Sequence, residues 1–316
     1  MLIFITNFKN KSIIFFSMDD VLIIGTVALD TIETPFGKVE KGIGGSATYA
    51  SYAASFFSKP AVISVIGHDF PKEYIELLEK RGINLDGLKV HDKTFHWDGY
   101  YEYDMNEAKT RKTELNSLAN FKADVPENYK EIKYIFLANI DPEQQLETIK
   151  QMKNPKFIVL DTMNFWISSK KKSLLDVIKK VDVLLLNDGE ARQLFGTISL
   201  VKAANEALCL GPKAVIIKKG EHGALLFTKN KHFNAPGYPL ENIKDPTGCG
   251  DCFGGAFIGY LAKTNDLSES NFRKAIIYGS VIASHNAEDF GLNRLKNLTM
   301  NDIEKRYKEF QAIREF

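Results

Sequence analysis

The chain has 316 residues, enough for one large α/β domain with a small appendage or for two ordinary domains. Its 41 lysines and arginines nearly balance its 40 aspartates and glutamates, so no strong field favours nucleic acid or an anionic membrane as a partner. Three cysteines are too few for a disulfide framework, which favours a cytoplasmic location.

The first 17 residues, MLIFITNFKNKSIIFFS, raise a separate question. Their two apolar runs are too short to span a membrane, and no small-residue cleavage site accompanies them. Met18 then opens MDDVLIIG, a convincing first strand. We therefore interpret residues 1–17 as a disordered or wrongly assigned extension, and residues 18–316 as the folded domain.

From Met18 onward, strand-like apolar runs alternate with segments of helical period. The runs that predict strands are VLIIGTVA, PAVISVIG, YIFLANI, FIVLDTM and DVLLLND. The segments that predict helices are SATYASYAASFF, PKEYIELLEKRG, PEQQLETIKQM, SLLDVIKKV and GEARQLF, and then CFGGAFIGYLA and NFRKAIIYGSVIASHNAED near the end of the chain. Nearly continuous Ile, Val and Leu runs between amphipathic helices indicate an α/β fold with a parallel sheet covered on both faces.

Two segments, near residues 31–43 and 94–118, lack a helical period. Their alternating aromatic and β-branched positions predict antiparallel strands beside the main sheet. Such an insertion suits a lid over a pocket, but a packed hairpin with no role in binding fits the composition equally well. The second segment has aromatic residues that could stack on a nucleobase or form its own small core: Phe95, Trp97, Tyr100, Tyr101 and Tyr103.

Several common nucleotide and metal motifs are absent from the sequence. Gly25 follows the first strand without the further glycines of G-x-G-x-x-G, which argues against a Rossmann dehydrogenase. No G-x-x-x-x-G-K-S/T, no H-E-x-x-H and no Cys/His cluster occurs, so neither a P-loop enzyme nor a zinc enzyme is indicated.

The stretch KDPTGCGDCFGGAFIGYLA, residues 244–262, supports two different chemistries. Cys249 and Cys252 have the C-x-x-C spacing of a dithiol redox site. Residues 247–250 also precede a helix whose N-terminal amides and flanking glycines could hold a polyanion. Asp251 could be a simple helix cap, or it could accept the proton of a substrate hydroxyl beside bound phosphates.

The chain resembles the ribokinase, or PfkB, family of carbohydrate and nucleoside kinases. DPTGCGD is similar to the family's D-T-x-G-A-G-D signature, and GIGGSATYASYAA is similar to its glycine-pair segment. VIGHDF, LLNDGEARQL and KKGEHGALL resemble its V-G-x-D-x-F, its N-x-x-E element and its glycine-rich strand-turn near the nucleotide. These matches follow the family's order over nearly everything from Met18 to the C-terminus.

The resemblance implies a three-layer ribokinase-like fold with a small β-sheet lid. It implies an ATP-dependent kinase that phosphorylates a hydroxyl of a small sugar by direct in-line transfer, with a nucleoside as the alternative acceptor. Asp251 then matches the family's catalytic base, and Gly248, Cys249 and Gly250 match its anion hole.

Further residues match the positions that bind the substrates. Asp30, Gly44 and Gly45 match the residues that hold sugar hydroxyls, and Asn187 and Glu190 match the pair that organises Mg²⁺ near the phosphates. Taken singly, each has an ordinary explanation as a turn or a helix start.

The remaining implications concern the nucleotide, a cation and the assembly. Lys219 and Gly220 are expected near the nucleotide, and Asp245 and Thr247 match a segment near which some family members hold a monovalent cation such as K⁺. A small-molecule sugar or nucleoside is the expected partner, and the protein is expected to be a monomer or a homodimer formed through the lid.

The sequence also departs from the family pattern. Cys249 replaces the usual alanine, Pro246 the usual threonine, and Thr48 and Tyr49 lie where ribokinases proper have an asparagine for the sugar. The last difference argues against D-ribose itself as the acceptor. We also expect oxidation to join the two cysteines of the C-x-x-C pair and to distort the phosphate loop.

Two further functions stay open as alternatives. A dithiol oxidoreductase is suggested by the C-x-x-C pair, but the anionic Asp251 between the sulfurs disfavours a thiolate. A non-catalytic sugar-binding protein is conceivable because fold does not fix function, but the chain keeps Asp251 and its glycines.

Overall fold

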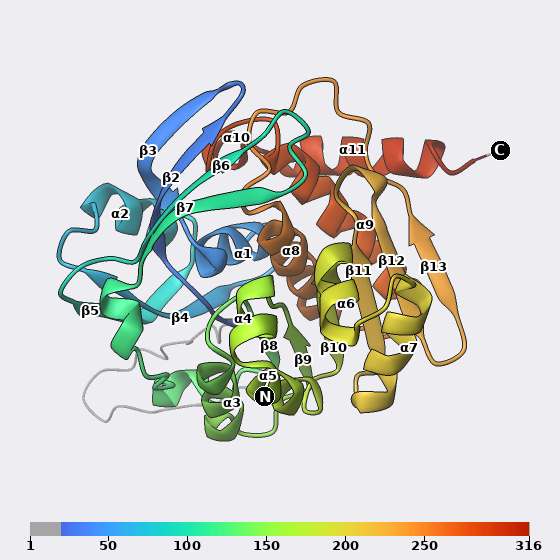
Figure 1. Ribbon diagram of the computed structural model, residues 1–316, viewed down its shortest axis with the longest axis horizontal. Coiled ribbons are helices and arrows are strands. Elements are labelled where there is room, and N and C mark those ends of the chain that lie inside the picture. The colour runs from blue at the N-terminus through green and yellow to red at the C-terminus, as the bar shows by residue number, and fades with distance from the viewer. Residues whose placement is uncertain (1–19, 316) are drawn as a thin grey trace, which may run out of the picture.

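The computed structural model describes residues 20–315 (Figure 1). A large sheet lies between two layers of helices, and a smaller sheet stands beside this body. This is the predicted three-layer α/β fold with a small second sheet. The interpretation of residues 1–17 concerns a segment outside the described residues.

The main sheet has nine strands in the order β13-β12-β11-β10-β9-β8-β1-β4-β5. Their bounds are β1 Val21–Ile24, β4 Pro60–Gly67, β5 Asn84–His91, β8 Tyr134–Leu137, β9 Phe157–Leu160, β10 Val183–Asn187, β11 Ala214–Lys218, β12 Ala224–Thr228 and β13 His232–Ala235. All pairs from β5 to β11 are parallel, and β12 and β13 add an antiparallel edge. The prediction of a mostly parallel sheet is confirmed.

Helices follow the strands as the apolar periodicity predicted. Their bounds are α1 Ser46–Ala54, α2 Lys72–Lys80, α3 Pro142–Gln151, α4 Asn164–Ser169, α5 Lys171–Ile178, α6 Asp188–Phe195, α7 Leu200–Leu210, α8 Cys249–Thr264, α9 Glu269–Asn286, α10 Asn293–Lys296 and α11 Met300–Ala312. The last two follow the stretches that were expected to be the final helices. Within residues 20–315, no helix combines the length and the apolar character needed to cross a bilayer.

Strand β1 explains why both faces of the sheet are covered. Its side chains alternate, so Val21 and Ile23 pack into the core beneath α1, α8 and α9, whereas Leu22 and Ile24 pack into the core beneath α5, α6 and α7. All four side chains are fully buried. A strand buried on both faces has no polar alternation, as the run VLII shows.

Glycines let α8 approach α1 closely. A Cβ atom on Gly255 would lie 2.0 Å from the carbonyl oxygen of Ala50, and one on Gly259 would lie 2.9 Å from that of Ala54. Since the two glycines are four residues apart, they share one face of the helix. This packing fixes the N-terminus of α8, where the candidate site begins.

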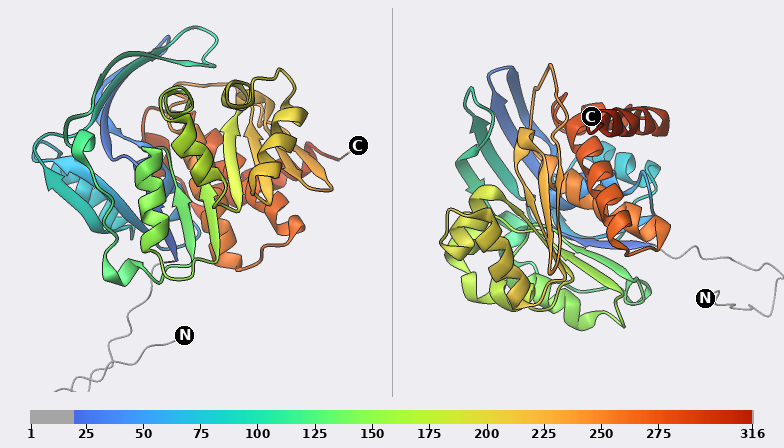
Figure 2. Two further views of the ribbon diagram at one scale, coloured as in Figure 1. Left: turned by 60° about the horizontal axis from the view of Figure 1, so that its bottom comes forward. Right: turned by 90° about the vertical axis from the view of Figure 1, so that its right-hand side faces the viewer.

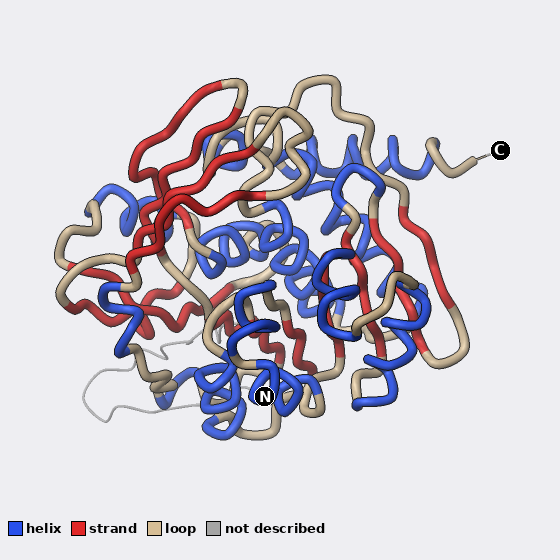
Figure 3. Tube along the Cα trace, viewed as in Figure 1, coloured by secondary structure: helices blue, strands red, loops and turns tan. Residues whose placement is uncertain are grey.

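The second sheet has four strands in the order β3-β2-β6-β7 and rises from the body in a curve (Figures 2 and 3). Their bounds are β2 Ala28–Thr34, β3 Gly37–Gly44, β6 His96–Tyr101 and β7 Ala108–Glu114. β2–β3 and β6–β7 are antiparallel hairpins, and β2 pairs with β6 in parallel.

One strand prediction is wrong. VLIIGTVA was expected to be a single strand, but β1 ends at Ile24 and the chain enters β2 of the second sheet at Ala28. Gly25 lies at the crossing, where a Cβ would be 2.6 Å from the Ser46 hydroxyl. Asp30 therefore lies within β2 of the second sheet.

Candidate active site

The carboxyl ends of neighbouring parallel strands bring the candidate residues together. Asn187 ends β10, Lys218 ends β11, and Asp161 directly follows β9. Ligands of open parallel sheets bind at this edge. The N-terminus of α8 reaches the same edge. Asp251, in its first turn, interacts electrostatically with Asp161 and Lys218.

Two glycines at the start of α8 leave room for two different side chains that pack against it. Gly248, the N-cap, has φ +75°, and a Cβ there would lie 2.4 Å from the ring of Tyr49. A Cβ on Gly250 would lie 3.1 Å from Nζ of Lys218. The motif is therefore an N-terminus packed against an aromatic ring on one side and an ammonium group on the other.

The backbone amides of this turn are not equivalent. The N–H of Cys249 donates to the carbonyl oxygen of Pro246 at 3.1 Å, so it is already used within the turn. Among the described residues, the amides of Gly248, Gly250 and Asp251 have no backbone acceptor, and the Asp251 amide contacts its own carboxyl group. Of the three residues predicted for an anion hole, Gly248 and Gly250 therefore have amides without a backbone acceptor, whereas the Cys249 amide is used within the turn.

Asp251 lies in the first turn of α8 in a strongly perturbed environment. Burial, helped by the nearby carboxylate of Asp161, raises its pKa to about 7, and Lys218 opposes the increase. A carboxyl group with a pKa near neutrality is matched to accepting a proton from a substrate hydroxyl. It is less suited to a simple helix cap, which prefers to stay ionised.

Two residues of this centre were not predicted. Nζ of Lys218 lies 2.6 Å from a carboxylate oxygen of Asp161, and their side chains are only 16% and 4% exposed. Both also interact electrostatically with Asp251. The available signal was a polar residue at the end of each apolar run, in FIVLD and AVIIK.

Asn187 and Glu190 form a capping box at the start of α6. The Asn187 side chain accepts from the Glu190 amide at 2.7 Å, and a Glu190 carboxylate oxygen accepts from the Asn187 amide at 2.7 Å. Burial raises the pKa of Glu190 to about 7. The ordinary explanation as a helix start is thus correct, and the same contacts hold a buried carboxyl group close enough to Lys218, Asp161 and Asp251 to interact with them.

Asp30 and the glycine pair are in direct contact. One Asp30 oxygen accepts from the Gly45 amide at 3.2 Å, and a Cβ on Gly44 would lie 1.9 Å from that oxygen. The other oxygen, Oδ1, is buried without a hydrogen-bond partner among the described residues. Burial raises the pKa of Asp30 to about 7, and Asp245 and Asp251 contribute to the increase.

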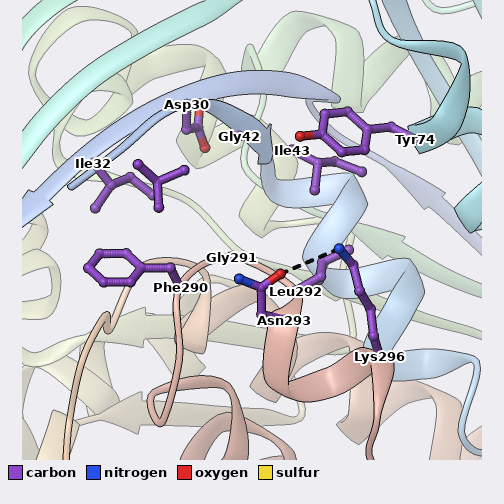
Figure 4. Close-up of a pocket in the computed structure, with 11 residues that line it drawn as sticks. Asp30, Ile32, Gly42, Ile43, Tyr74, Phe290, Gly291, Leu292, Asn293 and Lys296 are labelled. Atoms are coloured by element: carbon purple, nitrogen blue, oxygen red, sulfur yellow. Dashed lines mark hydrogen bonds between the residues drawn. The ribbon is translucent and has the colours of Figure 1, made fainter. Parts of the chain in front are cut away.

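A pocket of about 180 Å³ opens beside Asp30, and Figure 4 shows the Asp30 carboxylate directed into it. The second sheet contributes one wall and the α9–α10 connection the other. The lining residues drawn there include Ile32, Ile43, Phe290 and Asn293. We call Asp161, Glu190, Lys218 and Asp251 the strand-end centre, because they meet where the parallel strands end. Asp251 does not line the pocket, but it interacts electrostatically with Asp30, so the pocket adjoins this centre through Asp30.

The second sheet also contacts the start of α8. The hydroxyl of Thr247 lies 3.2 Å from that of Tyr101, which is on β6. Trp97 shares this face of β6, and its ring covers Gly99, where a Cβ would be 2.0 Å away. Tyr103 is 90% exposed. Of the predicted aromatic set, Trp97 and Tyr101 are therefore the two placed on the face that contacts the strand-end centre.

Lys219 and Gly220 lie in the turn between β11 and β12. The Lys219 amide donates to the carbonyl oxygen of Gly223 at 2.8 Å, and Gly220 has φ +55°. Among the described residues, the Lys219 side chain makes no hydrogen bond to the strand-end centre. Lys218, not Lys219, enters it.

Asp245 and Thr247 form the loop that leads into α8. The fully buried Asp245 carboxylate accepts from the amides of Thr247 at 2.9 Å and Gly291 at 3.3 Å. Asn286 donates to the Thr247 carbonyl at 2.8 Å, and its own side-chain oxygen is buried without a partner among the described residues.

The two sulfurs of the C-x-x-C pair face different helices. Cys249 Sγ lies 3.4 Å from the Ala283 carbonyl of α9, and Cys252 Sγ lies 3.8 Å from the Tyr49 carbonyl of α1. Burial raises the pKa of Cys249 to about 12 and that of Cys252 well above its ordinary value. This geometry supports neither a dithiol redox centre nor the predicted disulfide, because the thiols point apart and resist ionisation.

An α/β fold with open helix amides, a near-neutral carboxyl group and a buried lysine at one sheet edge has the properties of a phosphotransferase. The profile of the pfkB family carbohydrate kinases matches residues 18–297. The chain belongs to this family, whose members are ATP-dependent phosphotransferases acting on sugars or nucleosides.

Individual relatives agree with this assignment. The chain is 29% identical over 259 residues to a cytidine kinase of Thermococcus kodakarensis, covering 80% of this chain and 92% of that protein. It is 26% identical over 261 residues to a deoxyribokinase of Salmonella typhi, with coverages of 79% and 84%. An E. coli protein assigned as ribokinase II, solved with ATP and Mg²⁺, has a similar fold, with a TM-score of 0.75, 20% identity and coverages of 92% and 100%.

Proposed function

We propose that this kinase transfers the γ-phosphoryl group of ATP to a hydroxyl on the ribose ring of a nucleoside. The observation that carries the reaction is Asp251, a carboxyl group with a pKa near 7 beside the open amides of α8. We favour a nucleoside over the free sugar expected from the sequence, because the cytidine kinase has a higher identity to this chain and higher coverage than the deoxyribokinase.

The proposed reaction is direct in-line displacement. The acceptor oxygen forms a bond to the γ-phosphorus while the bond from that phosphorus to the β-γ bridging oxygen breaks, and ADP leaves. Asp251 takes the proton of the acceptor hydroxyl. The amides of Gly248 and Gly250 donate to the oxygens on which negative charge develops.

The residues present fit a magnesium ion held largely through water. The Glu190 carboxyl group is buried and held in place by the Asn187 amide. Mg²⁺, when bound, would neutralise charge on the donor phosphates. The contribution of the protein to magnesium binding would be a fixed Glu190 carboxyl group, and the capping box holds it in place. Asp245 and Thr247 remain the proposed location of a monovalent cation, supported by the unpartnered oxygen of Asn286.

The acceptor would bind between Asp30 and Asp251. The free Oδ1 of Asp30 can accept from a ring hydroxyl, and the adjoining pocket can receive the part of the acceptor that lies away from the reacting oxygen. The second sheet would act as a lid, since Tyr101 already touches Thr247. Trp97, whose ring covers Gly99 on the same face, would offer a stacking surface for a nucleobase.

The test is an ADP-release assay over a panel of nucleosides, pentoses and hexoses. We expect kcat/KM for the best nucleoside to exceed that for free ribose by about fivefold to 150-fold, since base stacking contributes about 1–3 kcal/mol beyond the sugar contacts. A free sugar used as efficiently as any nucleoside would overturn the nucleoside assignment and leave the kinase class intact.

Two variants sharpen this test. Trp97→Ala should raise KM for a nucleoside by about tenfold and leave KM for a free pentose unchanged, because only the base stacks. The matched control is Tyr103→Ala, whose ring is 90% exposed and which should change neither. Equal effects of Trp97→Ala on both acceptors would assign the ring to lid packing instead.

A further inference from the structure

Lys218 is a buried cation in an unusual position. Its side chain is 16% exposed, and its ammonium lies against Gly250 in the first turn of α8. The N-terminus of a helix carries partial positive charge, so a buried ammonium there is unfavourable unless an anion is also present. Asp161 supplies an anion in direct contact, and the carboxyl groups of Glu190 and Asp251 lie close enough to interact with the ammonium electrostatically.

The hydrogen bonds of Lys218 are incomplete. An ammonium group has three donors, and among the described residues the Lys218 side chain has one hydrogen-bond acceptor, an oxygen of Asp161 at 2.6 Å. The pair joins β11 to β9 across the end of β10, the strand whose last residue begins the α6 capping box. The remaining donors lie beside the open amide of Gly250.

We propose that Lys218 is a catalytic residue that donates to the γ-phosphoryl group during transfer, and that Asp161 is the positioning residue that holds it there. This inference rests on the proposed phosphoryl transfer. Lys218 keeps its protons throughout the reaction: the acceptor proton goes to Asp251, the new oxygen–phosphorus bond forms, and the electrons of the broken bond leave with ADP. Its contribution is a charge-assisted hydrogen bond to oxygens whose charge changes most in the transition state.

A purely structural ion pair is the competing explanation. Buried ion pairs add little net stability, because desolvation of both ions offsets their attraction. A structural role would also leave kcat unaffected once the protein is folded. The two explanations therefore differ in which quantity changes when Lys218 is replaced.

The experiment compares Lys218→Met, Lys218→Arg and Asp161→Asn with wild type. We expect Lys218→Met to lower kcat by about a hundredfold to a thousandfold, as removal of one oxyanion donor does. It should weaken binding of a non-hydrolysable ATP analogue by about tenfold and change ADP binding by less than threefold. Lys218→Arg should recover part of kcat, and Asp161→Asn should lower kcat with a smaller effect on analogue binding.

The matched control is Lys213→Met. Lys213 lies just before β11, at its opposite end, and pairs with Asp182 at 2.7 Å, so its loss removes a lysine ion pair remote from the strand-end centre. This variant should leave kcat and both binding constants unchanged. If Lys218→Met does not fold because Asp161 is left unpaired, the double variant Lys218→Met with Asp161→Asn removes both charges and replaces it.

The outcomes separate this inference from the proposed function. Lys218→Met with kcat and analogue binding within threefold of wild type would overturn the role of Lys218, and so would parallel weakening of ADP and analogue. If wild type phosphorylates no acceptor, the proposed function fails. A selective loss of analogue binding in Lys218→Met, measured by calorimetry without acceptor, would still support the Lys218 contact.

Discussion

Replacing Asp251 by asparagine should make the enzyme inactive and the ligand-free protein more stable. Asparagine keeps the size of the side chain but cannot accept the proton, so kcat should fall by about a hundredfold or more. The stability gain follows from the raised pKa. A carboxyl group whose pKa is about 7 in the folded state and 3.8 in the reference state lowers the free energy of unfolding at any pH where the unfolded chain is ionised.

The sign and size of this gain depend on pH. Below about pH 4 the carboxyl group is protonated in both states and Asp251 costs nothing. The cost grows between pH 4 and 7 and is complete above pH 7, where the shift from 3.8 to about 7 corresponds to an upper limit of about 4 kcal/mol. Because Asp251 keeps some solvent access, we expect about half of that value at pH 8. In a chain of 316 residues this is an increase in Tm of about 3 °C.

The assay is thermal unfolding of ligand-free wild type and Asp251→Asn at pH 8 and at pH 5, with ADP release measured in parallel. The Tm advantage of the variant should be largest at pH 8 and should be clearly smaller at pH 5, at about 0.4 to 0.7 of the pH 8 value. An unchanged or lowered Tm at pH 8 would refute the argument that burial raises the pKa of Asp251. Near wild-type turnover would refute its assignment as the base.

Three further predictions concern the magnesium pair, the lid and the cysteine. Glu190→Gln should raise the Mg²⁺ concentration for half-maximal rate by about tenfold and leave acceptor KM within twofold; a change confined to acceptor KM would place Glu190 on the other half of the site. Acceptor binding should slow hydrogen exchange between residues 94 and 118, and unchanged exchange would make the second sheet purely structural. Cys249→Ala should keep kcat within about threefold, since the hydrogen bonds of the sulfur among residues 20–315 are with α9 and the amide is used within the turn; loss of activity in a folded variant would give the thiol a function.

The sequence predicted most of the fold because the relevant signals are local. Continuous apolar runs gave the parallel strands, and helical periodicity gave the helices between them. The one wrong strand arises from a long-range contact. Gly25 interrupts VLIIGTVA because the Ser46 segment, twenty-one residues later, approaches the backbone there. Nothing within the run itself records that approach.

The sequence predicted the candidate-site residues that lie in a local motif, and it missed those that only the order of the strands brings together. Asp251 and Glu190 were recognisable because their neighbours in sequence are also their neighbours in space. Asp161 and Lys218 are 57 residues apart and meet because β9 and β11 flank β10 in the sheet. That Lys219 and Gly220 lie near the nucleotide stays a prediction, since both lie in the turn after β11, whereas Lys218, the last residue of the strand, enters the strand-end centre.

The contacts of individual residues decide between the redox site and the phosphate-binding site that residues 244–262 both suggested. Gly248 is required by the Tyr49 ring, Gly250 by the Lys218 ammonium, and Gly255 by the α1 backbone. The sulfurs of the C-x-x-C pair, by contrast, fill space between α8 and its two neighbouring helices. A spacing of three residues on a helix brings two side chains close together, but a dithiol centre also needs the two sulfurs to face each other, and here each approaches a carbonyl group of a different helix. The spacing that suggested a dithiol is therefore a consequence of packing, whereas the glycines and Asp251 supply the open amides and the proton acceptor that phosphoryl transfer needs.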